Sequence, residues 1–191
     1  MADNNNSYNV NAGKPKLGGA VFAAALGTSL PTSVSATLAE AFENLGFISD
    51  QGVVNSNSPS NTSIKEWGGA VVLDIQTEKP DTFKLAFLES TNLNVLKTIY
   101  GSSNVSGTLE TGITVNVNSS EMEQKSYVID MVLRNNGAKR VVIPMGKITA
   151  LSDITYAGGD AVKYEVTISA YPDSSGNTHY EYIKGTSNPS F

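Results

Sequence analysis

Apolar and polar residues alternate along much of the chain, and this alternation predicts a mainly β protein. It is clearest in residues 70–90, where apolar positions recur at every second residue on both sides of residues 79–81. A period of two sends successive side chains to opposite faces of a strand. The segment therefore predicts two strands folded back on each other at residues 79–81, with one apolar face that requires a core. The residues of this face are Val71, Leu73, Ile75, Phe83, Leu85 and Phe87.

Strand patterns also fill the second half of the chain, and turn residues separate them. Segments rich in Asn, Asp and Gly at residues 135–137, 158–160 and 173–177 supply residues that tolerate positive φ. The apolar run at residues 17–26 predicts a further strand, buried on both faces. We expect the remaining strands at residues 112–118, 125–134, 138–148, 161–171 and 178–184.

Two short helices are expected beside the strands. Thr37 and Glu40 have the spacing of a capping box, and Gly46 suits the left-handed residue that ends a helix. A second helix is expected at about residues 92–100, because its apolar side chains fall on one stripe and Gly101 follows it.

Residues 50–67 form the least ordinary segment of the chain. Between Val54 and Ile64 they contain almost no large apolar side chain, and they are rich in Ser and Asn. A structureless connection of this length is uncommon inside a compact domain. The segment predicts either a disordered loop or a long protruding hairpin with its tip near residues 57–61, and the flanking apolar residues favour the hairpin. Trp67 is expected to anchor the base of this hairpin or to fill the core.

The length of 191 residues suits a single domain with a sizeable core. We place that domain at residues 13–184, after a polar, flexible N-terminal arm at residues 1–12 and before a C-terminal tail at residues 185–191. The apolar run after Lys16 imitates a signal peptide, but polar residues precede it and it is too short to cross a bilayer. We therefore predict no interaction with a membrane.

Charged residues are scarce, at 16% against an ordinary share of about a quarter. Surfaces poor in charge are common where they become interfaces, because charges are costly to desolvate. An Asn- and Ser-rich loop composition explains the scarcity equally well. The formal net charge of −5 disfavours a grip on nucleic acid. The chain contains no cysteine, which excludes disulfides and thiolate sites.

No pattern in the sequence predicts an enzyme, a metal site or a bound cofactor. The single histidine, His179, has no nucleophile near it in the sequence and is expected to lie half-exposed on a strand. No phosphate-binding glycine loop occurs, and the turn at residues 173–177 lacks the ligand pattern of a calcium loop. Asp74, Glu78 and Asp81 cluster near lysines and predict a solvated or interface edge.

Two long stretches of the sequence carry a family resemblance. They are GKPKLGGAVFAAALGTSLPTSVSATLAEAFENLGFISDQGV, residues 13–53, and EWGGAVVLDIQTEKPDTFKLAFLESTNLNVLKTIYG, residues 66–101. Both resemble the major tail proteins, or tail tube proteins, of long-tailed siphovirus-type bacteriophages, particularly those of Gram-positive hosts and their prophages. The resemblance implies an antiparallel β-sandwich, barrel-forming fold with one or two short flanking α-helices and a long protruding hairpin or loop. It also implies rings of six subunits, stacked into a hollow tube through which genomic DNA leaves the capsid.

The resemblance suggests roles for three groups of residues. Candidates for a ring-stacking hairpin are Asp50, Asn55, Asn57, Pro59, Asn61, Ile64 and Trp67. Candidates for arms that bridge subunits are Tyr8, Val10, Pro189 and Phe191. Candidates for the wall of the lumen are Asp74, Gln76 and Glu78, since an acidic or neutral wall keeps DNA phosphates from sticking. The alternative for this last group is contact with the adjoining subunit, with another strand pair lining the bore.

The implied partners are other copies of the chain, a tail tip or baseplate initiator, a tape measure protein and a tail terminator. DNA would be only transient, non-specific cargo, and the protein would be part of the virion after assembly in the bacterial cytoplasm. Two other functions stay open. A monomeric β-sandwich binding module, such as an adhesin or a carbohydrate-binding domain, would expose an aromatic platform. A tube protein of a contractile tail or secretion-type machine would contact a sheath, but no stretch identifies such a surface.

Overall fold

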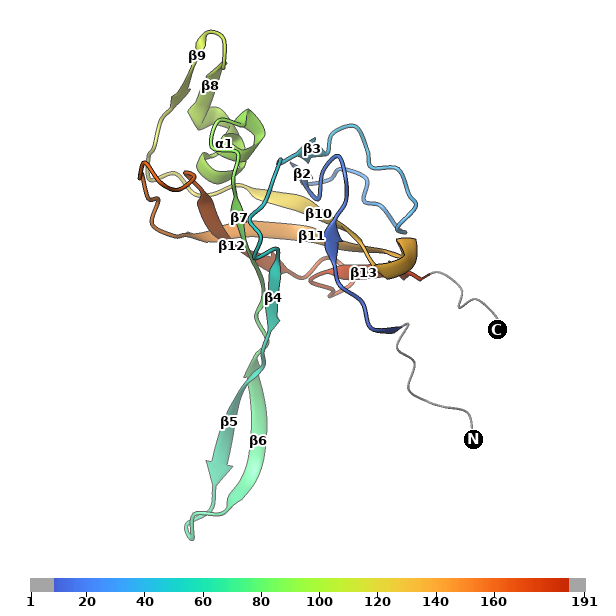
Figure 1. The fold of residues 1–191 in the computed structure, drawn as a ribbon. Coiled ribbons are helices and arrows are strands. Elements are labelled where there is room, and N and C mark those ends of the chain that lie inside the picture. The colour runs from blue at the N-terminus through green and yellow to red at the C-terminus, as the bar shows by residue number, and fades with distance from the viewer. Residues whose placement is uncertain (1–8, 186–191) are drawn as a thin grey trace, which may run out of the picture.

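One large antiparallel sheet dominates the computed structural model, which describes residues 9–185 (Figure 1). The strand order is β3-β2-β10-β11-β12-β7-β4, with β1 paired to β10 and β13 paired to β11. Its strands are β1 (Lys14–Pro15), β2 (Val21–Ala25), β3 (Glu43–Asn44), β4 (Val54–Asn57), β7 (Asp81–Phe87), β10 (Gln124–Val132), β11 (Ala138–Leu151), β12 (Tyr164–Tyr171) and β13 (Tyr180–Lys184). Two separate strand pairs are β5 (Ser60–Lys65) with β6 (Val71–Glu78), and β8 (Val105–Thr108) with β9 (Gly112–Val115).

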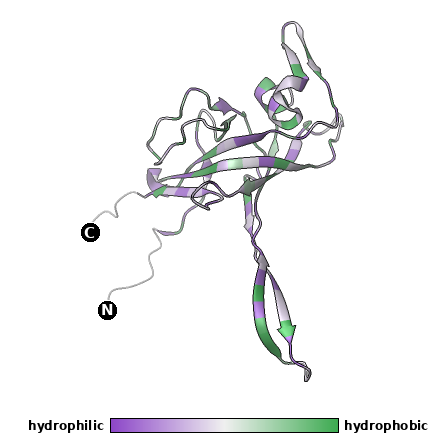
Figure 2. Cartoon of the chain, turned by 180° about the vertical axis from the view of Figure 1, so that it is seen from behind, coloured by the Kyte–Doolittle hydropathy of each residue, from purple (hydrophilic) through white to green (hydrophobic). Residues whose placement is uncertain are grey.

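Apolar clusters cover both faces of the sheet, as in a sandwich. The larger cluster joins Phe83 and Ile168 of the sheet to Leu96 of helix α1 (Leu93–Tyr100). On the opposite face, Val128 and Val142 pack with Phe42 of the loop that follows β2. Figure 2 shows the alternation of apolar and polar segments along the strands that produces these two faces. The predicted mainly β fold is confirmed, and residues 9–185 form no closed barrel by themselves.

Helix α1 confirms the helix expected at residues 92–100. The side chain of Asn92 accepts a hydrogen bond from the Asn94 backbone N–H and so caps the first turn. Gly101, with φ of +94°, ends the helix. Its buried residues include Leu96 and Ile99, which lie on the predicted stripe.

The strands predicted in the second half of the chain are also confirmed, with ends that differ by a few residues from the observed β9 to β13. Asn135 and Asn136 have φ of 56° and 60°, so the turn before β11 uses the residues expected for it. In β2, Ala23 lies in the larger cluster and Ala24 in the smaller one, which confirms a strand buried on both faces. Strand β8 was not predicted.

The helix predicted to begin at Thr37 is wrong. Residues 33–46 form turns and the short strand β3, which pairs with β2. Arg140, from the sheet, donates hydrogen bonds to the carbonyl oxygens of Ser33 and Ala36 at 3.0 and 2.7 Å. Because the sheet binds the backbone of this segment directly, the local capping signal does not decide its conformation.

The hairpin predicted for residues 70–90 is wrong as a pairing, although both of its strands exist. Strand β6 pairs with β5, whereas β7 lies between β12 and β4. Residues 54–87 therefore form one long hairpin, and its tip lies at residues 66–70 instead of near residues 57–61. A period of two identifies a strand but not its partner, and Pro80 only interrupts the ladder because it lacks an N–H.

Candidate assembly surface

The outer part of the long hairpin projects from the body of the protein (Figure 1). We call this part, residues 58–80, the stacking arm. Residues 58–59 and 79–80 interrupt the two ladders at the same level, since Asn57 pairs with Asp81 and Ser60 pairs with Glu78. Each interruption contains one proline, Pro59 or Pro80, so the arm is joined to the sheet through a break in backbone pairing.

Every residue of the stacking arm is exposed, including its large apolar residues. Leu73 lies opposite Ile64, and Val71 and Ile75 share its side of β6 by the alternation of a strand. Their exposed fractions lie between 44% and 56%. The expectation that Val71, Leu73 and Ile75 are buried in a core is therefore wrong, because β6 leaves the sheet and carries them into solvent. Within residues 9–185, this apolar face of the arm has no partner.

The other face of the arm carries polar residues and one large apolar residue, Val72. Asp74 and Gln76 lie opposite Ser63 and Asn61, and Glu78 follows on the same side of β6. The Ser63 hydroxyl donates to Asp74 Oδ1 at 2.8 Å. The three residues predicted to face the lumen thus share one face of the arm, and their orientation toward a lumen stays a prediction.

The tip of the arm is a tight turn held by Glu66. Its carboxylate accepts hydrogen bonds from the backbone N–H groups of Gly68 and Ala70 at 2.7 and 3.1 Å, and these bonds lower the pKa of Glu66. Gly69 takes a φ of +94°, which a side chain would disfavour. Trp67 is fully exposed at this tip. Both roles expected for Trp67, at the hairpin base and in the core, are therefore wrong.

A buried polar cluster holds the root of the long hairpin. Asp81, only 2% exposed, accepts hydrogen bonds from Asn55 Nδ2 at 2.8 Å and from Thr178 Oγ1 at 2.6 Å, and its Oδ2 lies 2.5 Å from His179 Nδ1. Burial raises the pKa of Asp81, but the hydrogen bonds from Thr178, His179 and Asn55 outweigh it and hold the pKa below its ordinary value. The His179 ring also meets Phe83 edge to face, with centroids 5.2 Å apart.

This cluster corrects the sequence interpretation of Asp81, which is not part of a solvated edge. The signal was hidden because Asp81 and His179 are distant in sequence and meet only where β7 enters the sheet. The cluster joins β4, β7 and the segment before β13, so it fixes the direction in which the hairpin leaves the body.

The remaining candidate residues, predicted for ring stacking or for bridging arms, lie in three parts of the chain. Asp50 precedes β4 in a turn, and Val10 is 71% exposed near the start of the described chain. Tyr8, Pro189 and Phe191 lie outside the described residues. The ring-stacking candidates lie along the long hairpin, in β4, in the break, in β5 and at the tip; they are Asn55, Asn57, Pro59, Asn61, Ile64 and Trp67.

A second hairpin, β8–β9, projects from the opposite end of the body (Figure 1). Gly107 and Gly112 both take positive φ beside its turn, and Leu109 is 70% exposed there. The sequence interpretation missed β8, although glycines on both sides of the turn at residues 108–111 are a signal for a hairpin.

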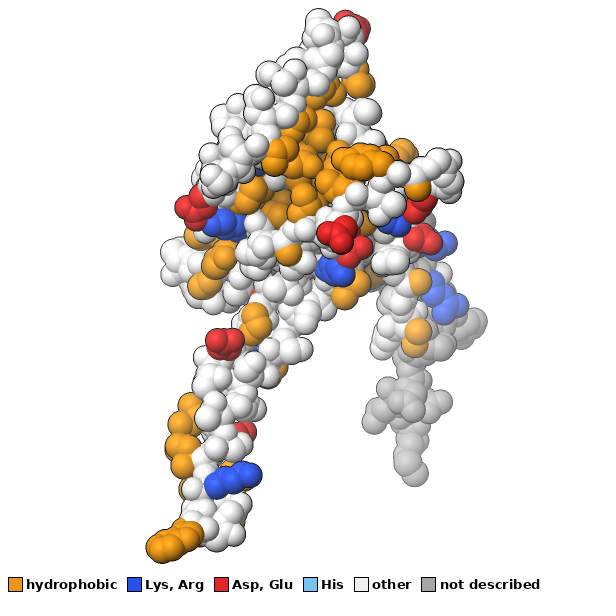
Figure 3. All heavy atoms as spheres, turned by 90° about the vertical axis from the view of Figure 1, so that its left-hand side faces the viewer, with side chains coloured by type: hydrophobic (Ala, Val, Ile, Leu, Met, Phe, Trp, Pro, Cys, Tyr) orange, Lys and Arg blue, Asp and Glu red, His pale blue; other side chains and the backbone are white. Residues whose placement is uncertain are grey.

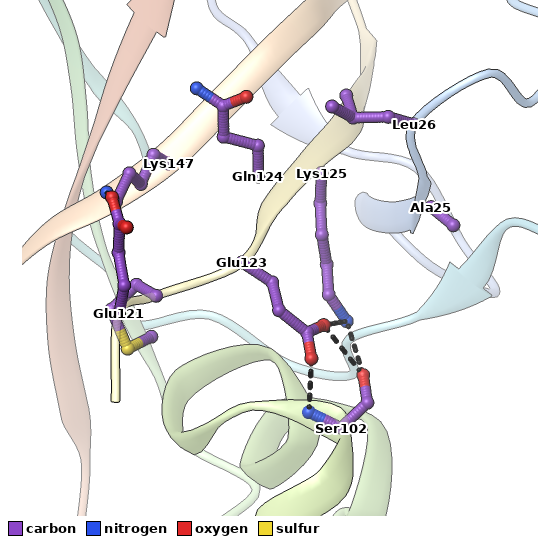
Figure 4. Close-up of a pocket in the computed structure, with 9 residues that line it drawn as sticks. Ala25, Leu26, Ser102, Glu121, Glu123, Gln124, Lys125 and Lys147 are labelled. Atoms are coloured by element: carbon purple, nitrogen blue, oxygen red, sulfur yellow. Dashed lines mark hydrogen bonds and ion pairs between the residues drawn. The ribbon is translucent and has the colours of Figure 1, made fainter. Parts of the chain in front are cut away.

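An open cavity of about 560 Å³ borders β10 and Ser102, which lies two residues after the end of α1 (Figure 4). Glu123 accepts hydrogen bonds from the Ser102 N–H and hydroxyl at 3.1 and 2.9 Å, and Lys125 Nζ lies 4.0 Å from Glu123 Oε2. Lys147 and Glu121 form an ion pair at 2.5 Å on the other side. Since these charges pair with one another, we assign the cluster a structural role that holds the segment after α1 and residues 121–123 against the sheet.

Within residues 9–185, no group of His, Asp and Glu side chains has the arrangement needed to hold a metal ion. No helix in this part of the chain combines the length and the apolar character that a membrane span requires. The surface features that stand out are the stacking arm, the second hairpin and the outer edges of β3 and β4, which have one neighbour each in the sheet. Free strand edges and unpartnered apolar faces are sites at which further chains bind.

The comparisons with known proteins agree with this description. A family model described as phage tail tube protein matches residues 1–190. No curated protein sequence matches the chain.

Proposed function

Because the chain belongs to the phage tail tube protein family, and is thereby a structural component of a phage tail, we propose that its copies form hexameric rings that stack into a hollow tube. The tube would conduct genomic DNA during ejection. In this proposal a long-tailed phage assembles the tube in the bacterial cytoplasm, on a tail tip initiator, around a tape measure protein and up to a tail terminator.

The stacking arm is the observation that supports this proposal most. An isolated two-stranded hairpin is marginally stable in water, so an arm of this length gains from a partner. Fully burying one Val, Leu or Ile side chain contributes about 1.5–3 kcal/mol. Contact between the apolar face of the arm and a neighbouring ring would therefore stabilise both the arm and the tube.

The polar face of the arm fits the proposed conduit. If the apolar face lies against a neighbour, the opposite face with Asp74, Gln76 and Glu78 is free to face the lumen. Carboxylates at this place repel DNA phosphates, and the net charge of −5 acts in the same direction.

Removal of the arm tests the proposal. In the variant, residues 58–80 are replaced by a two-residue Asn-Gly turn that joins β4 to β7. We expect this variant to keep the thermal unfolding transition of the body, because the arm contributes no residue to either apolar cluster. Size exclusion and negative-stain microscopy should then show rings and tubes for the natural chain and only dispersed subunits for the variant. Tubes from the armless variant would refute the stacking role.

A further inference from the structure

Beyond stacking in general, the surface that binds the tip of the arm can be assigned. We propose that the tip of the stacking arm, with Trp67, binds a hollow formed by Tyr100, Tyr156 and Tyr164 on a second copy of the chain. We call this surface the tyrosine hollow. The inference rests on the proposed tube assembly and names the surface that receives the arm.

The tyrosine hollow gathers residues from three segments. The rings of Tyr100, at the end of α1, and Tyr164, at the start of β12, meet edge to face with centroids 6.2 Å apart. Tyr156, in the loop before β12, is 77% exposed and lies close enough to raise the pKa of both other phenols, in addition to the effect of their burial. Ile113 and Ile154 are partly buried against the same apolar cluster.

Figure 3 shows that hydrophobic side chains gather on this side of the protein, in a hollow between the β8–β9 hairpin and the sheet. Tyr164 belongs to the larger core cluster and is buried, whereas Tyr156 beside it is largely in solvent. An apolar surface that reaches the core and carries exposed aromatic rings is typical of a binding site for another protein.

The stacking arm supplies a matching ligand. In the part of the chain that the structure describes, Trp67 and the apolar face of the arm are exposed, and the arm points away from the body (Figure 1). The hollow lies beside the β8–β9 hairpin at the other end of the body (Figure 3). The two surfaces therefore cannot cover each other within one chain. Between copies they form a head-to-tail contact, which repeats along an axis and produces an open stack.

The chemistry of the two surfaces favours a second copy over other occupants. Trp and Tyr contribute most to the centres of protein interfaces, where their rings are buried against each other. In the proposed contact, the tip of the arm contributes Trp67 and the hollow contributes three tyrosines, so both surfaces carry aromatic rings. A competing apolar cavity of about 330 Å³ lies elsewhere, lined by Leu17, Phe47 and nine other residues. The experiment must therefore distinguish the tyrosine hollow from this cavity as the surface that binds the arm.

Disulfide trapping can distinguish the two surfaces without background crosslinks, because the natural chain has no cysteine. The donor variant is Lys65→Cys, next to the tip, which leaves Trp67 in place. It is combined with Asp153→Cys, Thr155→Cys or Ala157→Cys around the hollow; all four positions are exposed. A disulfide requires Cα atoms about 4.4–6.8 Å apart, which is why three partner positions are tried. Matched controls combine Lys65→Cys with Leu17→Cys at the competing cavity, or with Ser175→Cys in a remote turn.

We expect oxidised tubes to give a ladder of covalent oligomers with at least one hollow variant, and only weak dimers with either control. Normal tubes that crosslink through Leu17, or through none of the hollow positions, would overturn the tyrosine hollow while leaving the tube itself established. Chains that form no tubes under any condition would overturn the proposed function, and the hollow with it.

Ring substitutions give a second readout. Tyr156→Ala and Trp67→Ala should each raise the protein concentration needed for assembly about tenfold or more, the usual effect of truncating an interface hot spot. Tyr156→Phe and Trp67→Phe, which keep an aromatic ring, should stay within about threefold of the natural chain. Equal losses for the Ala and Phe variants, or no loss for either, would contradict the proposal. Circular dichroism of the unassembled variants verifies that each is folded.

Discussion

At the scale of single residues, two buried polar groups organise the body. Asp130 and Arg140 form a bidentate pair, with Nε and Nη2 of the arginine 2.6 and 2.7 Å from the carboxylate oxygens. The remaining guanidinium nitrogen binds the carbonyls of Ser33 and Ala36. This one side chain therefore attaches the loop that covers the smaller apolar cluster. The second group is Asp81, at the root of the long hairpin.

Removing one partner of the buried ion pair should be costly. Arg140→Met leaves the Asp130 carboxylate buried, with the half-exposed Lys16 ammonium 3.5 Å away, and frees the covering loop. We expect a loss of about 3–5 kcal/mol in the free energy of unfolding, measured by urea denaturation. The double variant Asp130→Leu with Arg140→Met should recover much of this loss, because no buried charge is left unpaired and the Lys16 ammonium is more than half exposed. A double variant as unstable as the single one would contradict the role given to the pair.

Asp81 predicts a dependence of stability on pH. Its pKa is lower in the folded protein than in the unfolded chain, so its contribution is present above the unfolded value, ordinarily about 3.9, and is lost as pH falls through the folded value. Asp81→Asn should lower the free energy of unfolding by about 1–3 kcal/mol at pH 7 and remove part of the loss of stability below about pH 5. Urea denaturation between pH 3 and pH 7 would measure both effects.

Asp160→Asn is the matched control for this prediction. Asp160 is exposed and its partner, Lys163, lies three residues away on the surface. Such pairs contribute little, so the control should unfold like the natural chain at every pH. If Asp81→Asn had the same free energy of unfolding as Asp160→Asn at every pH, the buried polar cluster at the root of the long hairpin would not contribute to stability.

At the scale of elements, local patterns predicted strands well and their partners poorly. The alternation at Val71, Leu73 and Ile75 identifies β6, and Asn92 with Gly101 marks both ends of α1. Neither pattern shows that β6 pairs with β5, because a strand's pairing partner depends on which chain segments are near it in space. The capping signal at Thr37 failed for the same reason: pairing with β2 and the bonds from the sheet decide that segment.

The candidate site was predicted in outline. The scarcity of apolar residues after Val54 correctly indicates a protruding hairpin, but the sequence pattern places the apolar face of its second strand, β6, in the core. A strand with an apolar face looks the same in sequence whether a core or another subunit covers it. The tyrosine hollow was beyond the reach of sequence patterns, since Tyr100, Tyr156 and Tyr164 come from separate segments.

The polar face of β6 predicts an effect of charge on DNA passage. Reversing Asp74 and Glu78 to Lys should leave tube assembly unchanged, because both side chains are exposed on the face opposite Leu73. DNA ejection should become slower, since lysines at the wall attract phosphates, and the slowing should weaken at high salt. Ejection kinetics in vitro, with phages that carry the variant tube, would measure it.

The neutral variant Asp74→Asn with Glu78→Gln is the matched control. It removes the acidic groups without introducing attraction, so ejection should stay close to the natural rate. If the lysine variant also ejects DNA at the natural rate at every salt concentration, these residues do not line the lumen, and another strand pair does.

At the scale of the whole molecule, the chain has two unlike ends. A long arm with an exposed tryptophan projects from one end, and a second hairpin flanks the tyrosine hollow at the other (Figures 1 and 3). Few charges have to be desolvated when such a chain associates, because charged residues make up only 16% of it. Unlike ends produce polymers that grow head to tail instead of closed dimers.

Trp67 is the only tryptophan, so its fluorescence reports on the tip of the arm alone. In dispersed subunits the indole is in water, and its emission should lie at long wavelength. On assembly the emission should shift to shorter wavelength in step with light scattering. Emission that stays at long wavelength in complete tubes would mean that the tip remains in solvent.

The most direct measurement is a cryo-electron microscopy reconstruction of tubes assembled from the natural chain. We predict stacked rings of six subunits around an open lumen, with each stacking arm extending into the adjacent ring and its tip beside the tyrosines of a subunit there. Tubes whose rings touch only through their sheets, with every arm free in solvent, would contradict the account.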